Sequence, residues 1–214
     1  MDSARISELL QPFLATPASA EQTRHISTYI DLLLHWNTRI NLTSIRQPKE
    51  IVTRHFGESL FTARHLFPSS QSDLPATTGR LLDIGSGAGF PGLAIKIWVP
   101  NLGATLIESN QKKAIFLREV IRKLTLTCVD VFPGRAEDFS SPAEVVTLRA
   151  VEHFEHALPT AARLVAARGR LALLIGEGQV QRTRQLTPEL RWSEPLSIPL
   201  SSSRVLFIGK QESE

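Results

Sequence analysis

One segment of the chain carries glycines at alternate positions directly after an apolar run. Gly85, Gly87 and Gly89 follow residues 81–84, which are apolar except for Asp83, and Phe90 and Pro91 come next. Glycine has no Cβ, so the backbone can turn sharply here and a ligand can lie against it. A turn with a purely structural role also uses glycine. At the first strand-to-helix turn of an α/β sheet, however, the pattern favours a nucleotide-binding site.

The residues after the glycines narrow the kind of nucleotide. The dinucleotide fingerprint has glycine where this chain has Phe90, and Pro91 removes one of the helix N-terminal N–H groups that would hold a pyrophosphate. No Gly-Lys-Ser/Thr follows, which excludes a Walker loop. The candidate that remains is an adenosyl ligand without phosphates, of which S-adenosylmethionine is the common case.

Polar residues also follow the next three expected strands, where they would share one edge of a parallel sheet. Glu108, 19 residues after Gly89, can accept both ribose hydroxyls, or it can cap the helix that starts near Asn110. The trio 136–138 can meet an adenine, or it can be a solvated helix start. Arg149 can hold a carboxylate or phosphate, or it can form a surface ion pair.

The elements that position these residues are short apolar strands that alternate with helices from Arg80 onward. This order predicts an α/β fold, namely a doubly wound, mostly parallel, seven-stranded Rossmann-like sheet that ends in an antiparallel hairpin. The predicted strands are residues 81–84, 104–108, 128–132, 145–148, 170–175, 196–200 and 204–208.

The first third of the chain is predicted to be helical. Ser19 and Gln22 have the spacing of a capping box, and apolar residues recur behind them at helical spacing up to Ile40. Pro48 suits the first turn of a second helix. We therefore expect a helical extension over 1–67 that packs on the core, a Pro/Ser/Thr-rich linker over 68–79, and a catalytic domain over 80–214.

The composition limits the class of protein. The chain has 214 residues, of which 42% are hydrophobic and 21% charged, so it is predicted to be a globular protein without a membrane span. The net charge of +3 permits a nucleic-acid partner without requiring one. The single cysteine, Cys128, excludes an internal disulfide and a multi-cysteine zinc site, so we expect a cytoplasmic protein with no metal. Cys128 itself is predicted to be an inert strand residue.

Six motifs together resemble the RsmG (GidB) family of bacterial 16S rRNA guanine-N7 methyltransferases. They lie in family order over about residues 30–150, and the Phe-Pro-Gly extension and the Asn-Leu-Thr run are the most specific parts. The motifs are Trp36-Asn-x-x-Ile-Asn-Leu-Thr-Ser-Ile45, Arg54-His-Phe-x-x-Ser-Leu60, Asp83-Ile-Gly-Ser-Gly-Ala-Gly-Phe-Pro-Gly-Leu93, Lys112-Lys-x-x-Phe-Leu-Arg-Glu119, and Gly134-Arg-Ala-Glu137 with Arg149-Ala150.

The resemblance implies S-adenosylmethionine as cofactor and a guanine in the 530 loop of 16S rRNA, free or in the 30S subunit, as substrate. It also implies a set of cofactor-binding residues, namely Gly85, Gly87, Phe90, Glu108, Ser109, Asn110, Ala136, Glu137 and Arg149. The chain departs from the family in having Gly176-Glu177 in place of Lys-Gly after the fifth strand, and Leu148 in place of Ser before Arg149. We expect a monomer.

The reaction and the RNA-binding face follow from these residues. Guanine N7 has a free lone pair and no proton, so in-line transfer needs no general base, and we assign no catalytic acid or base.

Arg54 and His55 share a predicted helix and are candidates for contacts to RNA phosphates, with a structural role equally compatible. Trp36 is predicted to pack the extension on the core rather than to stack on a base.

Other functions remain open at this stage. The chain lacks the Asn/Asp-Pro-Pro-Tyr/Phe run of amino-group methyltransferases and the Pro-Cys nucleophile of carbon methyltransferases. The alternatives are a methyltransferase that acts on another substrate, a non-catalytic RNA-binding assembly factor and, more distantly, an NAD oxidoreductase.

Overall fold

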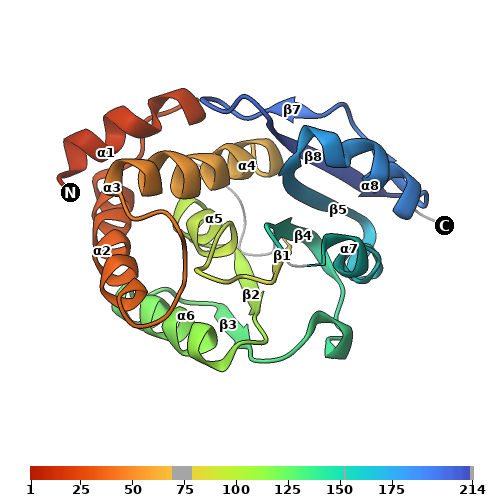
Figure 1. Ribbon diagram of the computed structural model, residues 1–214, viewed down its shortest axis with the longest axis horizontal. Coiled ribbons are helices and arrows are strands. Elements are labelled where there is room, and N and C mark those ends of the chain that lie inside the picture. The colour runs from red at the N-terminus through yellow and green to blue at the C-terminus, as the bar shows by residue number, and fades with distance from the viewer. Residues whose placement is uncertain (69–78, 152, 213–214) are drawn as a thin grey trace.

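The computed structural model describes residues 1–68, 79–151 and 153–212, and it shows a twisted sheet with helices on both faces (Figure 1). Most of the predicted linker, residues 69–78, lies outside the described residues. In the part of the chain that the structure describes, no helix is both long and apolar enough to span a membrane. Nor does any group of three or more His, Cys, Asp or Glu side chains there suit a metal ion.

The sheet confirms the predicted α/β class. Its strand order is β3-β2-β1-β4-β5-β8-β6, with β8 antiparallel to β5 and the two-residue β7 paired to β8 as an eighth strand. The strands are β1 (Arg80–Ile84), β2 (Gly103–Ile107), β3 (Val129–Phe132), β4 (Ala143–Arg149), β5 (Val165–Gly176), β6 (Leu190–Trp192), β7 (Leu196–Ser197) and β8 (Arg204–Gln211).

The sequence prediction missed β6 and placed Cys128 wrongly. β6 has only three residues and pairs with β8 alone, so no apolar run marks it in the sequence. Cys128 is exposed and lies just before β3 with φ at +56°, so it is a turn residue rather than a strand residue.

Alternate strand residues face two separate apolar layers, as expected for a sheet covered on both sides. On one face Leu81 and Val145 pack against helices of the first half of the chain. On the other, Leu82 and Val146 pack against α7 (Phe154–Arg163) and the short segments near it. The remaining helical elements after β1 are α5 (Gly92–Trp98), α6 (Gln111–Lys123), η3 (Ala136–Asp138), η4 (Glu177–Gln179) and α8 (Val180–Leu186).

The N-terminal helices form a further layer over α5 and α6 and share a single apolar core with them. They are α1 (Ser3–Leu10), η1 (Gln11–Phe13), α2 (Ala20–Asn37), α3 (Pro48–Glu50), η2 (Ile51–Gly57) and α4 (Glu58–Leu66). The capping box is confirmed, because Ser19 Oγ accepts from Gln22 N and Gln22 Oε1 accepts from Ser19 N. Trp36 packs edge-on against Phe116 of α6, as predicted.

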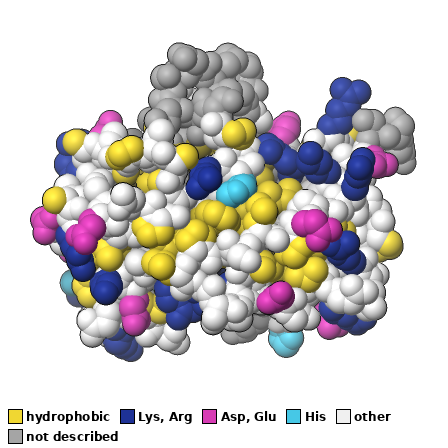
Figure 2. Space-filling model, turned by 90° about the horizontal axis from the view of Figure 1, so that it is seen from above, with side chains coloured by type: hydrophobic (Ala, Val, Ile, Leu, Met, Phe, Trp, Pro, Cys, Tyr) yellow, Lys and Arg dark blue, Asp and Glu magenta, His cyan; other side chains and the backbone are white. Residues whose placement is uncertain are grey.

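The segment η2 is a π-helical stretch between α3 and α4. Such wide turns are rare, and they occur frequently at functional sites. This one carries Arg54 and His55. Figure 2 shows the molecule from above the view of Figure 1. Hydrophobic side chains form a band across the middle of this face, and charged side chains of both signs lie around the band. This mixture of charges agrees with the small net charge of the chain.

Candidate functional site

The glycine-rich loop between β1 and α5 is held in a conformation that only glycine adopts easily. Gly85, Gly87 and Gly89 have φ angles of +65°, +55° and +86°. The loop is closed by short backbone contacts, with Gly89 N donating to Ser86 O at 2.6 Å and Ser86 N donating to Ile107 O of β2 at 3.0 Å. The loop therefore lies across the carboxyl ends of β1 and β2.

Asp83, in β1 directly before this loop, helps to hold the loop in place. Its carboxylate is fully buried, and it accepts from Thr147 Oγ1 of β4 at 2.7 Å and from Gly92 N at the start of α5 at 3.2 Å. Burial raises the pKa of Asp83 to about 6, although these hydrogen bonds and Arg149 favour its charged form. Asp83 thus ties two strands and a helix together beneath the loop.

Glu108 joins the loop to the second strand-to-helix turn. Its Oε2 accepts from Gly87 N at 2.8 Å, and its Oε1 accepts from Asn110 N at 2.7 Å. The cap of α6 is Asn110 itself, whose Oδ1 accepts from the backbone N of Lys112 and of Lys113. The alternative that Glu108 caps this helix is therefore wrong.

These two turns form one side of an open cavity of about 690 Å³. The other side comes from the helical extension, through residues 42–45 and the π-helical segment η2, and Arg149 lies at the end of β4. A volume of this size is within the range of small-molecule sites. The cavity lies at the carboxyl edge of the sheet, where ligands bind in this class of fold.

Three aromatic rings connect the cavity to the extension. Phe90 is stacked with His55 at a centroid distance of 4.8 Å and with Tyr29 of α2 at 5.3 Å. The Tyr29 hydroxyl donates to Ala88 O at 2.6 Å, and burial raises the pKa of this phenol well above its usual value. Tyr29 therefore stays protonated and fixes the glycine-rich loop from the side of the extension.

The Asn-Leu-Thr run is fixed by the last residue of α2. Asn37 accepts from Leu42 N and Thr43 N through Oδ1, at 2.9 and 3.0 Å, and it donates to Thr43 O at 2.8 Å. Thr43 Oγ1 in turn accepts from Ile45 N at 3.1 Å and contacts His55 Nε2 at 2.8 Å. The motif thus builds a rigid wall for the cavity.

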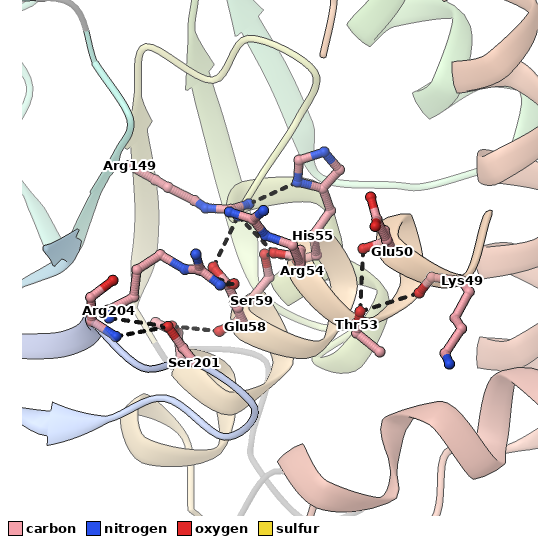
Figure 3. A network of polar contacts seen from close by, with 12 residues as sticks. Lys49, Glu50, Thr53, Arg54, His55, Glu58, Ser59, Arg149, Ser201 and Arg204 are labelled. Atoms are coloured by element: carbon pink, nitrogen blue, oxygen red, sulfur yellow. Dashed lines mark hydrogen bonds and ion pairs between the residues drawn. The ribbon is translucent and has the colours of Figure 1, made fainter. Parts of the chain in front are cut away.

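Arg149 is held by a network centred on Glu58 (Figure 3). Glu58 is 1% exposed, and its two oxygens contact Arg149 Nη2 at 3.0 Å and Arg204 Nη2 at 2.6 Å. Arg149 also donates to Arg54 O at 2.6 Å. Arg149 therefore forms a buried ion pair, rather than the surface pair that the sequence left open.

His55 is held in its neutral form. Its Nδ1 lies 3.3 Å from Arg149 Nη1 and accepts, because arginine can only donate; its Nε2 then carries the proton and donates to Thr43. Burial and three nearby arginines, Arg149, Arg54 and Arg204, lower the pKa of His55 to about 3.

We expect His55 to remain neutral in solution at pH 5. Nitrogen-15 NMR of the ring should show the Nε2–H tautomer unchanged from pH 8 to 5, whereas the urea-unfolded chain titrates near 6.5. Because the folded pKa is lowered, the free energy of unfolding falls as the pH drops from 6.5 towards 3, by up to about 1.4 kcal/mol per pH unit from this group. A ring that protonates between pH 7 and 5 would contradict this picture.

The cavity brings together most of the residues proposed from the sequence. Seven of the nine cofactor candidates line it, and so do both substrate candidates; they are Gly85, Gly87, Phe90, Glu108, Ser109, Asn110 and Arg149, with Arg54 and His55. Ala136 and Glu137 do not line it. Ala136 packs in the core below α7, and Glu137 lies 3.8 Å from His156.

Sequence reasoning missed the residues that position the site. The sequence patterns assign no role to Glu58 or Arg204, and they place Asn37 only in the Trp36-Asn motif at the expected end of a helix and Tyr29 only on an apolar helix face. The signal for Tyr29 was its hydroxyl, which must find a partner when the ring is buried. Glu58 gave no comparable signal, because its neighbours at helical spacing include the polar residues Arg54, His55 and Thr62.

The chain is similar along most of its length to proteins of one family. Residues 22–204 match the family model GidB, rRNA small subunit methyltransferase G. A protein named ribosomal RNA small subunit methyltransferase G from Xylella fastidiosa (strain 9a5c) is 38% identical over 188 residues, which cover 86% of this chain and 84% of the relative. A protein of the same name from Chloroflexus aggregans is 38% identical over 205 residues, covering 90% and 83%.

Solved structures share the fold at low sequence identity. TYW2 of M. jannaschii in complex with AdoMet aligns with a TM-score of 0.56 and 15% identity, over 73% of this chain and 77% of that one. The ribosomal protein L11 methylase of Lactobacillus delbrueckii aligns with a TM-score of 0.58 and 9% identity, over 73% and 80%.

Proposed function

Since the chain belongs to the GidB family, rRNA small subunit methyltransferase G, we propose that it transfers the methyl group of S-adenosylmethionine to N7 of a guanine in the 530 loop of 16S rRNA. The family resemblance seen in the sequence is confirmed, and the chain is an rRNA small subunit methyltransferase. The target atom, the loop and the route of transfer form the proposal. The cytoplasmic location and the monomeric state also remain predictions.

The cavity suits an adenosyl sulfonium compound. S-adenosylmethionine supplies a methyl group that is activated by a cationic sulfur. Gly85 and Gly87 line the cavity, and a Cβ at Gly87 would meet no atom nearer than Gly85 O at 3.7 Å. The Glu108 carboxylate lies within the cavity, where it can accept ribose hydroxyls. Phe90, Ser109, Asn110 and Arg149 complete this side. Ala136 and Glu137 are proposed for the adenine from the family resemblance alone.

The single observation that carries the proposal is the bridge that Glu108 makes from Gly87 N to Asn110 N. It fixes a carboxylate between the first two strand-to-helix turns by two backbone N–H groups. A phosphate group placed directly against this carboxylate would be repelled, whereas ribose hydroxyls or a cationic sulfonium would not.

The groups around the cavity support transfer without a general base. Among the described residues that line it, His55 is neutral with both ring nitrogens engaged, and Glu108 already accepts from two N–H groups. The other charged groups there are the cations Arg54, Lys113 and Arg149. Positioning is then the main catalytic contribution of the protein.

We expect the single-turnover rate of methylation to be independent of pH between 7 and 9. Asp83, with its pKa of about 6, and His55, with its pKa of about 3, are both in one protonation state over this interval. The rate should be measured with enzyme and methyl donor in excess over rRNA, so that each rRNA molecule is methylated in a single turnover. A bell-shaped profile that disappears when one titratable side chain is replaced would show that a general base exists.

The proposed function is tested by mapping N7-methylguanine in 16S rRNA by mass spectrometry, in cells with and without this protein. The modification should disappear with the gene and return with the wild-type chain or with Glu8→Gln, an exposed control. Glu108→Gln should fail to restore it. If purified protein transfers a labelled methyl group from S-adenosylmethionine to small molecules instead of rRNA, a methyltransferase of another substrate is favoured. If it binds RNA but forms no methylated product, an assembly factor is favoured.

A further inference from the structure

The cavity has a second side that the proposed cofactor contacts do not use. It consists of residues 42–45 with Arg54 and His55, all of which belong to the helical extension. This side faces the glycine-rich loop and Glu108 across an open volume of about 690 Å³. A methyl acceptor must reach this same volume.

The hydrogen bonds of His55 leave only one part of its ring available to a ligand. Nδ1 is engaged by Arg149 and Nε2 by Thr43. One face is covered by Phe90, at 4.8 Å and with an interplanar angle of 16°. What remains of the ring to line the cavity is its second face and its carbon edge, which can stack but cannot accept a proton.

The stack behind His55 is rigid. Phe90 lies nearly parallel to Tyr29, at 11°, and edge-on to Phe56, at 86°. Phe90 and Phe56 are buried, and the Tyr29 hydroxyl is bonded to Ala88 O. A planar group placed on His55 would therefore extend a stack that is anchored in the core.

We propose that the open face of His55 is the platform on which the target guanine stacks for methylation. This inference rests on the function proposed above and changes the role expected for His55, from a contact with RNA phosphate to a contact with the base. Enzymes that modify bases read them in pockets lined by aromatic or apolar side chains, and a base stacks on any aromatic face.

A neutral ring also suits the charge that appears on the base. Methylation of N7 converts a neutral guanine into a cation: the N7 lone pair forms the new N–CH3 bond, the S–CH3 bond of the sulfonium breaks with its electron pair left on sulfur, and no proton leaves. A neutral π-face attracts a cation, whereas an imidazolium would repel it. The contacts of Arg149 and Thr43 with the two nitrogens keep the ring in the favourable state.

The test compares His55→Phe with His55→Leu. Both variants lose the two nitrogens and their contacts; phenylalanine keeps an aromatic face, whereas leucine replaces it with a smaller aliphatic side chain. We expect kcat/KM for 30S subunits to be about tenfold to a hundredfold higher for His55→Phe than for His55→Leu. Binding of 7-methylguanosine monophosphate to protein saturated with S-adenosylhomocysteine, measured by calorimetry, should differ in the same direction.

Affinity for S-adenosylhomocysteine serves as the control and should be the same in both variants, which also shows that both are folded. Equal kcat/KM for the two variants, with wild-type activity intact, would overturn the platform. So would an S-adenosylhomocysteine affinity that follows the aromatic face, because the ring would then belong to the cofactor side. If the wild type binds the methylated nucleotide but does not methylate 30S subunits, the proposed function fails and the purine platform is retained.

Discussion

Replacing Glu58 with alanine is expected to lower the free energy of unfolding by about 3–5 kcal/mol, because it leaves buried cations without a partner. The Glu58 side chain is 2% exposed, and those of its partners Arg149 and Arg204 are 12% and 28% exposed. Burial already lowers the pKa of Arg149, and Glu58 opposes that shift. Without the carboxylate, both guanidinium groups must find water or move apart.

Urea unfolding followed by circular dichroism measures this effect. The matched control is Glu155→Gln, which removes the carboxylate from an ion pair with Arg182 at the surface; it should leave the unfolding midpoint unchanged. Affinity for S-adenosylhomocysteine should fall in Glu58→Ala as well, since Arg149 loses its anchor beside the cavity. Equal midpoints for Glu58→Ala and Glu155→Gln would show that the network contributes nothing to stability.

The elements of the fold that were predictable are those that local patterns determine. Short segments rich in apolar residues predicted β1, β2 and β4, and the Ser19 capping box predicted the start of α2. The three residues of β6 are a strand only because β8 lies beside them. The pairing of β6 with β8 depends on the rest of the sheet, so no local sequence pattern predicts it.

In the candidate site too, some residues could be predicted from local sequence patterns and others could not. The glycine-rich loop and Glu108 follow predicted strands directly, so the order of the chain already places them at one edge. The residues that hold them come from far away in sequence, with Tyr29 59 positions before Ala88 and Glu58 146 positions before Arg204. A pattern of apolar spacing shows that such a residue is buried, but it does not show which partner it meets.

Replacing Gly89 with alanine tests how tightly the extension holds the loop. A Cβ at Gly89 would overlap the Tyr29 hydroxyl and press on Leu93, and φ of +86° is unfavourable for any residue with a Cβ. We expect a loss of about 2–5 kcal/mol in the free energy of unfolding. Displacement of the loop should lower rRNA methylation about a hundredfold.

Gly87→Ala is the matched control, because φ there is +55° but the nearest atom to the added methyl is Gly85 O at 3.7 Å. Gly87→Ala should lower the free energy of unfolding only by the strain of a positive φ at a residue with a Cβ, about 1–2 kcal/mol. Adding Tyr29→Phe to Gly89→Ala removes the overlapping hydroxyl, so the double variant should regain part of the stability lost by Gly89→Ala. Strictly additive losses in this double-mutant cycle would mean that Tyr29 and the loop are not coupled, and that the extension does not set the shape of the cavity.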